Sequence, residues 1–112
     1  MKPEIKNLSR TSLEVIATRF RSLGDASRLQ LLQCLFKGEK SVQDLCEATG
    51  MSQANVSKHL SLLSEQGIIA RRKQQQFSYY SICDSSIYIL CDLVCASVGK
   101  RYGQVMKELS GI

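Results

Sequence analysis

Apolar residues recur at helical spacing through most of the chain. Between Leu8 and Leu23 they lie on one face of a predicted helix, at Leu13, Ile16, Ala17, Phe20 and Leu23. Gly24 ends this helix, and Asp25 is a suitable N-cap for a second helix that continues to Phe36. The inward positions predicted for the second helix are Leu29, Leu32 and Phe36.

Two shorter helices follow, separated by a tight turn. Gly38 stops the second helix, and Ser41 is the predicted N-cap of a third, whose core positions are Val42 and Leu45. Gly50 can end the third helix, and Ser52 caps a fourth that ends at Gly67. The apolar stripe of the fourth helix is Val56, Leu60 and Leu63. Helices joined by about three residues are typical of a helix-turn-helix.

From Ile68 the spacing changes from helical to alternating. Residues 68–71 and 77–82 are rich in strand-forming side chains and flank a polar tip, which predicts a hairpin. Asp84 or Ser85 then caps a last helix that can continue to Leu109, although Gly99 and Gly103 weaken the continuation. Its apolar stripe is Ile87, Leu90, Cys91, Val94, Cys95 and Val98.

This order of elements predicts a mainly helical fold with a small β-hairpin, a winged helix-turn-helix. The 112 residues form one domain, 1–112. The first and last helices, 8–23 and 84–109, carry more apolar surface than so small a domain can cover. We therefore expect a homodimer, with two copies paired through these helices around a two-fold axis.

Polar side chains at the start of the fourth helix and cations in the hairpin point to double-stranded DNA as the partner. Short amides and hydroxyls at a helix N-terminus suit base edges in a major groove. Lysine and arginine contact phosphates, and the net charge of +5 agrees with a polyanionic partner. The predicted DNA-contacting residues are Ser52, Gln53, Asn55, Ser57, Lys58, His59, Arg71, Arg72 and Lys73.

Composition excludes several other classes of protein. A hydrophobic content of 44% is too high for a disordered chain, and no apolar run is long enough to cross a bilayer. Nothing near Met1 resembles a secretory signal, so we expect a cytoplasmic protein with no membrane partner. One histidine, no acid–base pair at a defined spacing and no glycine-rich phosphate loop argue against an enzyme.

The chain resembles the ArsR/SmtB family of dimeric winged-helix repressors over roughly residues 20–98. Three segments carry the resemblance: Leu23-Gly24-Asp25-Ala26-Ser27-Arg28-Leu29, Ser52-Gln53-Ala54-Asn55-Val56-Ser57-Lys58-His59-Leu60, and Arg72-Lys73-Gln74 leading to Tyr79-Tyr80. The resemblance implies a repressor that leaves its operator when an inducer binds, and with the expected two-fold dimer we predict that this operator is palindromic. In this family the inducer is often a metal ion, arsenite or a reactive sulfur species.

The chain departs from the inducer sites of the family. Arsenite sensors often carry three thiols on the third helix, where this chain has only Cys46. The zinc site on the last helix looks absent, because Ser97 and Lys100 stand where its later ligands should fall. Cys34 with Cys91 or Cys95 does not match the register of the persulfide sensors. In the wing, Gln75 replaces a frequent turn glycine, which costs about 1 kcal/mol if φ is positive.

Five cysteines, an odd number without Cys-x-x-Cys spacing, argue against a disulfide framework or a zinc ribbon. Cys91 and Cys95 are spaced i, i+4 on the last helix, and Cys83 precedes it, so these three thiols are candidate sensors. No cofactor is certain, and a thiophilic metal ion or arsenite is the candidate inducer. The thiols can equally be small apolar residues that pack along the dimer interface.

Two alternative functions therefore stay open. One is a regulator of the same fold that has no ligand and only structural cysteines. The other is a winged-helix module that binds proteins and does not recognise DNA.

Overall fold

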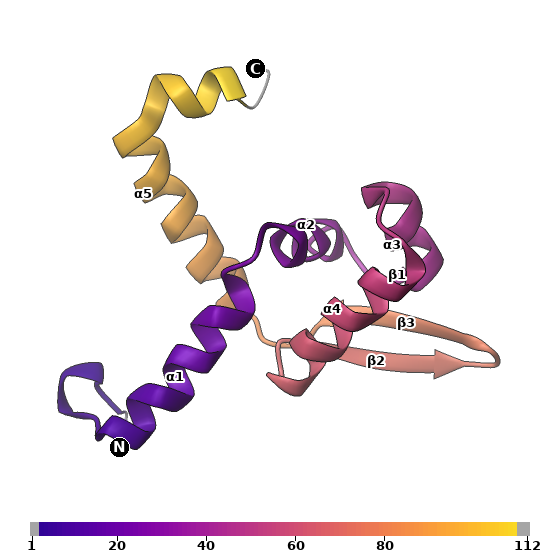
Figure 1. Ribbon diagram of the computed structural model, residues 1–112, viewed down its shortest axis with the longest axis horizontal. Helices are drawn as coiled ribbons and strands as arrows, with labels where there is room; N and C mark the ends of the chain where they lie inside the picture. Colours follow the sequence, from indigo (N-terminus) through magenta and orange to yellow (C-terminus); the bar gives the residue numbers. More distant parts are fainter. Residues whose placement is uncertain (1–2, 110–112) are drawn as a thin grey trace.

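The computed structural model describes residues 3–109, which form helices and one small sheet whose hairpin projects from the helical body (Figure 1). Its elements, in chain order, are the 3-10 helix Ile5–Asn7, α1 (Arg10–Leu23), α2 (Ala26–Leu35), β1 (Lys40–Ser41), α3 (Val42–Thr49), α4 (Gln53–Glu65), β2 (Ile69–Gln74), β3 (Phe77–Ile82) and α5 (Ser86–Leu109). The fold is the predicted winged helix-turn-helix, with one strand that the sequence did not indicate. β1 has two residues and pairs antiparallel with β3, so the sheet order is β1-β3-β2.

Several bounds and one facing prediction differ from expectation; α4, for example, ends at Glu65 rather than Gly67, and the first strand of the hairpin is Ile69–Gln74 rather than 68–71. The first helix begins at Arg10 rather than Leu8, because the Ser9 side chain accepts a hydrogen bond from the Ser12 N–H and caps it. The second helix ends at Leu35, and Leu29 was wrongly expected to face the core: it is 44% exposed. Leu31 and Leu35 are buried instead. α2 is apolar on several sides, so its sequence did not define a single inward face.

The core lies between α2, α3, α4 and the base of the hairpin. Its buried residues are Leu23, Leu31, Leu32, Leu35, Leu45, Val56, Leu60, Leu63, Ile68, Ile69 and Ile87. α1 contributes only Leu23 to this set, and α5 contributes only Ile87. The chain's own core is therefore built almost entirely by the segment between the terminal helices.

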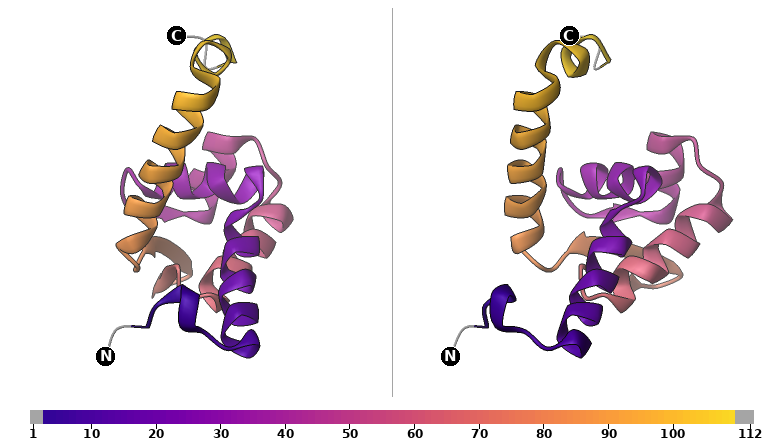
Figure 2. Two further views of the ribbon diagram at one scale, coloured as in Figure 1. Left: turned by 90° about the vertical axis from the view of Figure 1, so that its left-hand side faces the viewer. Right: turned by 60° about the vertical axis from the view of Figure 1, so that its left-hand side comes forward.

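The terminal helices lie on the opposite side of the molecule from the hairpin tip (Figure 1). α5 runs along one side of the body and bends near its end (Figure 2), where Tyr102 has non-helical φ and ψ angles of −116° and 21°. This bend falls between Gly99 and Gly103, where the sequence predicted a weakened helix. Within residues 3–109 we find no helix with the length and apolar character needed to span a bilayer.

Candidate nucleic-acid interface

The turn between α3 and α4 is fixed by hydrogen bonds at both helix ends. Ser41 and Asp44 form a capping box: the Ser41 hydroxyl accepts from the Asp44 N–H at 3.0 Å, and the Asp44 carboxylate accepts from the Ser41 N–H at 3.0 Å. Gly50 ends α3 with φ of +76°, a left-handed conformation that favours glycine. The Ser52 hydroxyl caps α4 by accepting from the Asn55 N–H at 3.1 Å. All three caps were predicted from the sequence.

α4 has one buried face and one exposed face. Val56, Leu60 and Leu63 are fully buried and hold the helix against the core. The exposed side chains in its first two turns include Gln53, Asn55, Ser57 and Lys58, which are free to meet a partner. This is the arrangement predicted for a recognition helix, and we use that name for α4 below. Amides and hydroxyls can bond base edges, and the Lys58 ammonium can bond phosphate.

His59 lies at the edge of the recognition helix, half-buried against Arg28 of α2. The Arg28 Nη1 atom is 3.2 Å from His59 Nδ1. A guanidinium can only donate, so Nδ1 is the acceptor of this hydrogen bond. Arg28 also donates from Nε to the Ser22 carbonyl at 2.6 Å and from Nη2 to the Arg21 carbonyl at 3.1 Å. The end of α1, the start of α2 and α4 are thus joined through one guanidinium.

The three wing cations do not share one face of the hairpin. Arg71 pairs with Tyr80 and Lys73 with Ser78, whereas Arg72 pairs with Tyr79. Because side chains alternate along a strand, Arg71 and Lys73 lie on the face opposite Arg72. Their adjacent positions in the sequence do not show this difference. The structure separates them into a pair and a single residue.

Arg72 is held by two neighbours within the chain. It forms a bidentate ion pair with Glu39, from Nη2 to Oε1 at 2.8 Å and from Nε to Oε2 at 3.1 Å. Its guanidinium also stacks over the Tyr79 ring at 4.8 Å. The hydrogen bond from Arg72 lowers the pKa of Glu39, so the carboxylate stays charged at neutral pH. Glu39 was missed in the sequence because the contact joins positions 33 residues apart.

The wing turns sharply at Gln75 and Gln76. Gln75 has φ of +58°, so the strained turn expected from the replaced glycine is present. Beside it, a hollow of about 550 Å³ separates the wing tip from α3 and the start of α4. Its polar lining includes Gln43, Gln53 and Gln76, which extends the candidate interface beyond the residues predicted from the sequence.

The candidate sensing thiols lie at two separate places. Cys91 is half-buried and Cys95 is exposed, and both line an apolar hollow of about 430 Å³ together with Phe20, Leu29 and Val94. Burial, and then the neighbouring Asp92 charge, raise the pKa of the Cys91 thiol, so it is protonated at neutral pH. Cys83 lies elsewhere and donates from its exposed thiol to the Gly67 carbonyl at 3.3 Å.

Within one chain Cys83, the expected third thiolate, does not form a metal site with Cys91 and Cys95. Among the described residues no three histidine, cysteine, aspartate or glutamate side chains come together to hold a metal ion. Cys34 and Cys46 pack against the core, as their helical positions suggested. Within residues 3–109 of one chain, a metal or arsenite would therefore meet at most the two thiols of α5.

Comparison with known proteins gives consistent results. Residues 25–71 match the family described as bacterial regulatory protein, arsR family. The chain is 41% identical over 64 residues to the arsenical resistance operon repressor of Escherichia coli, which covers 56% of the chain and 55% of that repressor. It is 30% identical over 63 residues to the transcriptional repressor SdpR of Bacillus subtilis, covering 56% of the chain and 70% of SdpR. The chain thus spans about half the length of the first of these relatives.

A solved structure supports the same assignment. The homodimeric winged helix-turn-helix DNA-binding domain of a possible ArsR-family regulator from Mycobacterium bovis superposes with a TM-score of 0.76 at 27% identity. The match covers 88% of this chain and 94% of that domain. Both the family and the fold are those of DNA-binding transcriptional regulators and not of enzymes. On the matching segment, the identities and the shared fold, this chain belongs to the ArsR family of bacterial regulatory proteins.

Proposed function

We propose that the protein is a homodimeric transcriptional repressor that binds a palindromic operator in duplex DNA. The observation that carries this proposal is the exposed polar face of α4 together with the exposed wing cations Arg71 and Lys73. Base edges would be contacted by Gln53, Asn55 and Ser57, and phosphates by Lys58, Arg71 and Lys73. Ser52 and His59 would serve mainly to hold the helix, and Arg72 would contribute less because Glu39 already neutralises it.

The dimer part of the proposal is supported by apolar side chains that the chain does not cover. Phe20, Leu29 and Val94 are 54%, 44% and 52% exposed around the 430 Å³ hollow, and Leu93 is 64% exposed on the same helix as Val94. A second copy related by a two-fold axis would cover this surface on both subunits at once. The two recognition helices would then enter successive major grooves about 34 Å apart.

A mobility-shift titration with genomic fragments at several salt concentrations tests DNA binding. We expect a shifted complex whose affinity falls steeply with salt, as phosphate contacts require. Val94→Glu should abolish the dimer in sedimentation and weaken the complex, while Gln33→Glu, an exposed site on α2, changes neither. Absence of any complex at low salt would contradict the proposal and favour a protein-interaction module.

Release by an inducer at the α5 thiols is the second part of the proposal. A ligand releases the operator only if it binds the free and DNA-bound forms unequally. Two i, i+4 thiols in one hollow at the expected subunit contact support such coupling. Native mass spectrometry of the reduced protein with arsenite, zinc, cadmium or a polysulfide donor would identify the bound species. Loss of release in Cys91→Ser and Cys95→Ser, but not in Cys83→Ser, is expected.

A regulator without a ligand is the second candidate, and one observation favours it. The raised pKa of Cys91 and the apolar lining around it suit a packing role better than metal binding. If the serine variants release the operator as the unchanged protein does in every inducer tested, the cysteines are structural.

A further inference from the structure

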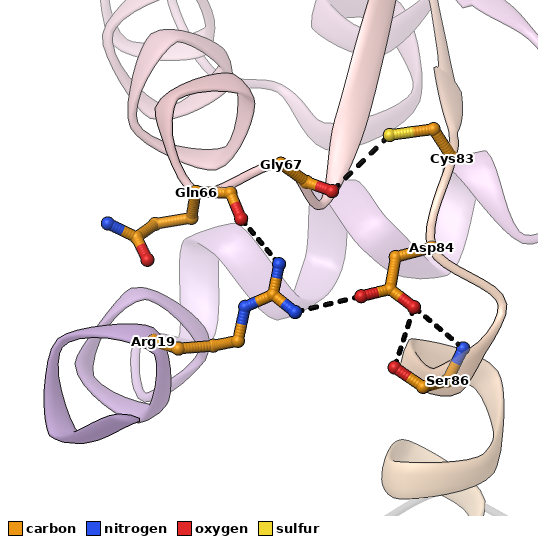
Figure 3. Close-up of polar contacts among 6 residues, drawn as sticks. All are labelled: Arg19, Gln66, Gly67, Cys83, Asp84 and Ser86. Atoms are coloured by element: carbon orange, nitrogen blue, oxygen red, sulfur yellow. Dashed lines mark hydrogen bonds and ion pairs between the residues drawn. The ribbon is translucent and has the colours of Figure 1, made fainter. Parts of the chain in front are cut away.

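Residues of three helices and their ends meet at one polar junction (Figure 3). The half-buried Arg19 of α1 reaches Asp84 with Nη1, 2.8 Å from Oδ2, and donates from Nη2 to the Gln66 carbonyl. The second carboxylate oxygen of Asp84 accepts from the Ser86 N–H at 3.0 Å and from the Ser86 hydroxyl at 2.6 Å. Gln66 is the C-cap of α4, and Ser86 is the first residue of α5.

The charges at this junction alternate in sign. The C-terminal end of α4 is partly negative, Arg19 is positive, Asp84 is negative, and the N-terminal end of α5 is partly positive. The Ser86 hydroxyl, followed by Arg19 and the Ser86 N–H, lowers the pKa of Asp84 to about 2. Asp84 is therefore ionised under all physiological conditions, and the two middle members, Arg19 and Asp84, each lie between two neighbours of opposite sign.

Besides this junction, Arg28 ties the end of α1 to α2 and α4, and the Phe36 ring packs on the Tyr88 ring of α5 with their centroids 4.7 Å apart. Within α1 only Ser22 and Leu23 are buried, and within the part of α5 whose side chains are described only Ile87 is. Cys83 adds two links between β3 and the turn after α4, from its N–H to the Ile68 carbonyl at 3.0 Å and from its thiol to the Gly67 carbonyl. Arg28 meets α4 near its middle, whereas Arg19 bonds the C-cap of α4 and Asp84, just before α5, at once, so the direction of α4 relative to both terminal helices depends in part on Arg19.

We propose that Arg19 is a positioning residue that fixes the angle between the recognition helix and the two dimerisation helices, and so determines the half-site spacing that the dimer recognises. This inference rests on the proposed function. Arg19 lies at the end of α4 opposite the residues proposed to contact DNA, so it acts through Gln66 and Asp84. Lysine cannot replace it fully, because one ammonium lacks the two separated nitrogens that reach both partners.

The test measures spacing preference rather than affinity alone. The unchanged protein first selects its half-site from a randomised duplex library, and duplexes are then made with two half-sites whose separation varies by single base pairs. Fluorescence anisotropy should give a sharp optimum for the unchanged protein. Arg19→Gln should reduce discrimination between spacings by about fivefold or more. Arg19→Lys should be intermediate, and dimerisation and affinity for a random duplex should be unchanged.

Arg10→Gln is the matched control. It removes the same charge from α1, but Arg10 is 88% exposed and pairs with Glu14 on its own helix at 3.2 Å. Its spacing profile should equal that of the unchanged protein. Asp84→Asn provides a second variant if Arg19→Gln does not fold, because the amide oxygen can still accept from Ser86. It should also broaden the optimum.

The outcomes separate this inference from the proposed function. If the unchanged protein selects no DNA, the proposed function itself is wrong, and this inference falls with it. If the protein binds two half-sites but has no preferred spacing, only the positioning role is overturned. The same holds if Arg19→Gln and Asp84→Asn both fold and keep the spacing profile of the unchanged protein.

Discussion

The apolar residues of the recognition helix are buried within the chain, whereas several of those on the terminal helices are exposed. In α4, Val56, Leu60 and Leu63 are fully buried by the chain's own core. In α1 and α5, Phe20, Leu93 and Val94 are each more than half exposed. The segment between the terminal helices therefore buries its apolar side chains within one chain, whereas those of the terminal helices need a partner to cover them. The difference indicates that fold and assembly are encoded in separate parts of this sequence.

The largest expected effect tests this division directly. Leu60→Ala removes a fully buried side chain and should lower the free energy of unfolding by about 2–5 kcal/mol at any protein concentration. Leu93→Ala, at a 64% exposed position, should act only by weakening the dimer, so its effect should shrink on dilution. Urea unfolding at several protein concentrations distinguishes the two. A Leu93 effect that did not depend on concentration would mean that α5 belongs to the core.

The next effect compares two wing cations that the sequence does not distinguish. Lys73→Gln should reduce the salt slope of DNA binding by about one unit and weaken binding about eightfold at 0.1 M salt. Arg72→Gln should have a smaller effect, because Glu39 already pairs with this guanidinium at 2.8 Å. Anisotropy titrations from low to high salt measure both slopes. Equal slopes would show that the ion pair with Glu39 opens on DNA.

A smaller effect concerns His59 at the edge of the recognition helix. His59→Asn places an oxygen near the position of Nδ1, so it should still accept from Arg28 and stay close to the unchanged stability. His59→Gln leaves Arg28 Nη1 without this acceptor and should lose about 1 kcal/mol of unfolding free energy. Urea midpoints at neutral pH compare the pair. A higher urea midpoint for His59→Gln than for His59→Asn would argue against the hydrogen bond to Arg28.

The smallest effect is the pH dependence of Asp84. Its pKa is lower in the folded chain, about 2, than the ordinary value of 3.8, so its stabilisation is present above pH 4 and is lost as pH falls toward 2. Asp84→Asn should therefore be less stable than the unchanged protein at pH 7, and the difference should narrow between pH 4 and pH 2. Thermal melts across this range measure it. A constant difference would mean that the charge of Asp84 is unimportant.

Local signals were enough to predict most elements of the body. The caps at Ser41 and Ser52 and the glycine at Gly50 each act within four residues, so their hydrogen bonds and backbone angles follow from adjacent sequence. The hairpin was predicted from alternation, although its strands are longer than 68–71 suggested on the first side. α2 shows the limit: it is apolar on several faces, and only packing decided that Leu31 is buried and Leu29 exposed.

The candidate site also has features that follow from local sequence and contacts that only folding makes. The amino-acid sequence by itself determined which side chains α4 and the wing can offer, because helix and strand periods fix which positions share a face. Only the tertiary structure decided that Glu39 neutralises Arg72, that Arg28 meets His59, and that Arg19 joins Asp84 to Gln66. It also kept Cys83 apart from Cys91 and Cys95. These contacts join positions 31 to 65 residues apart, and periodicity carries no information about pairs that only folding brings together.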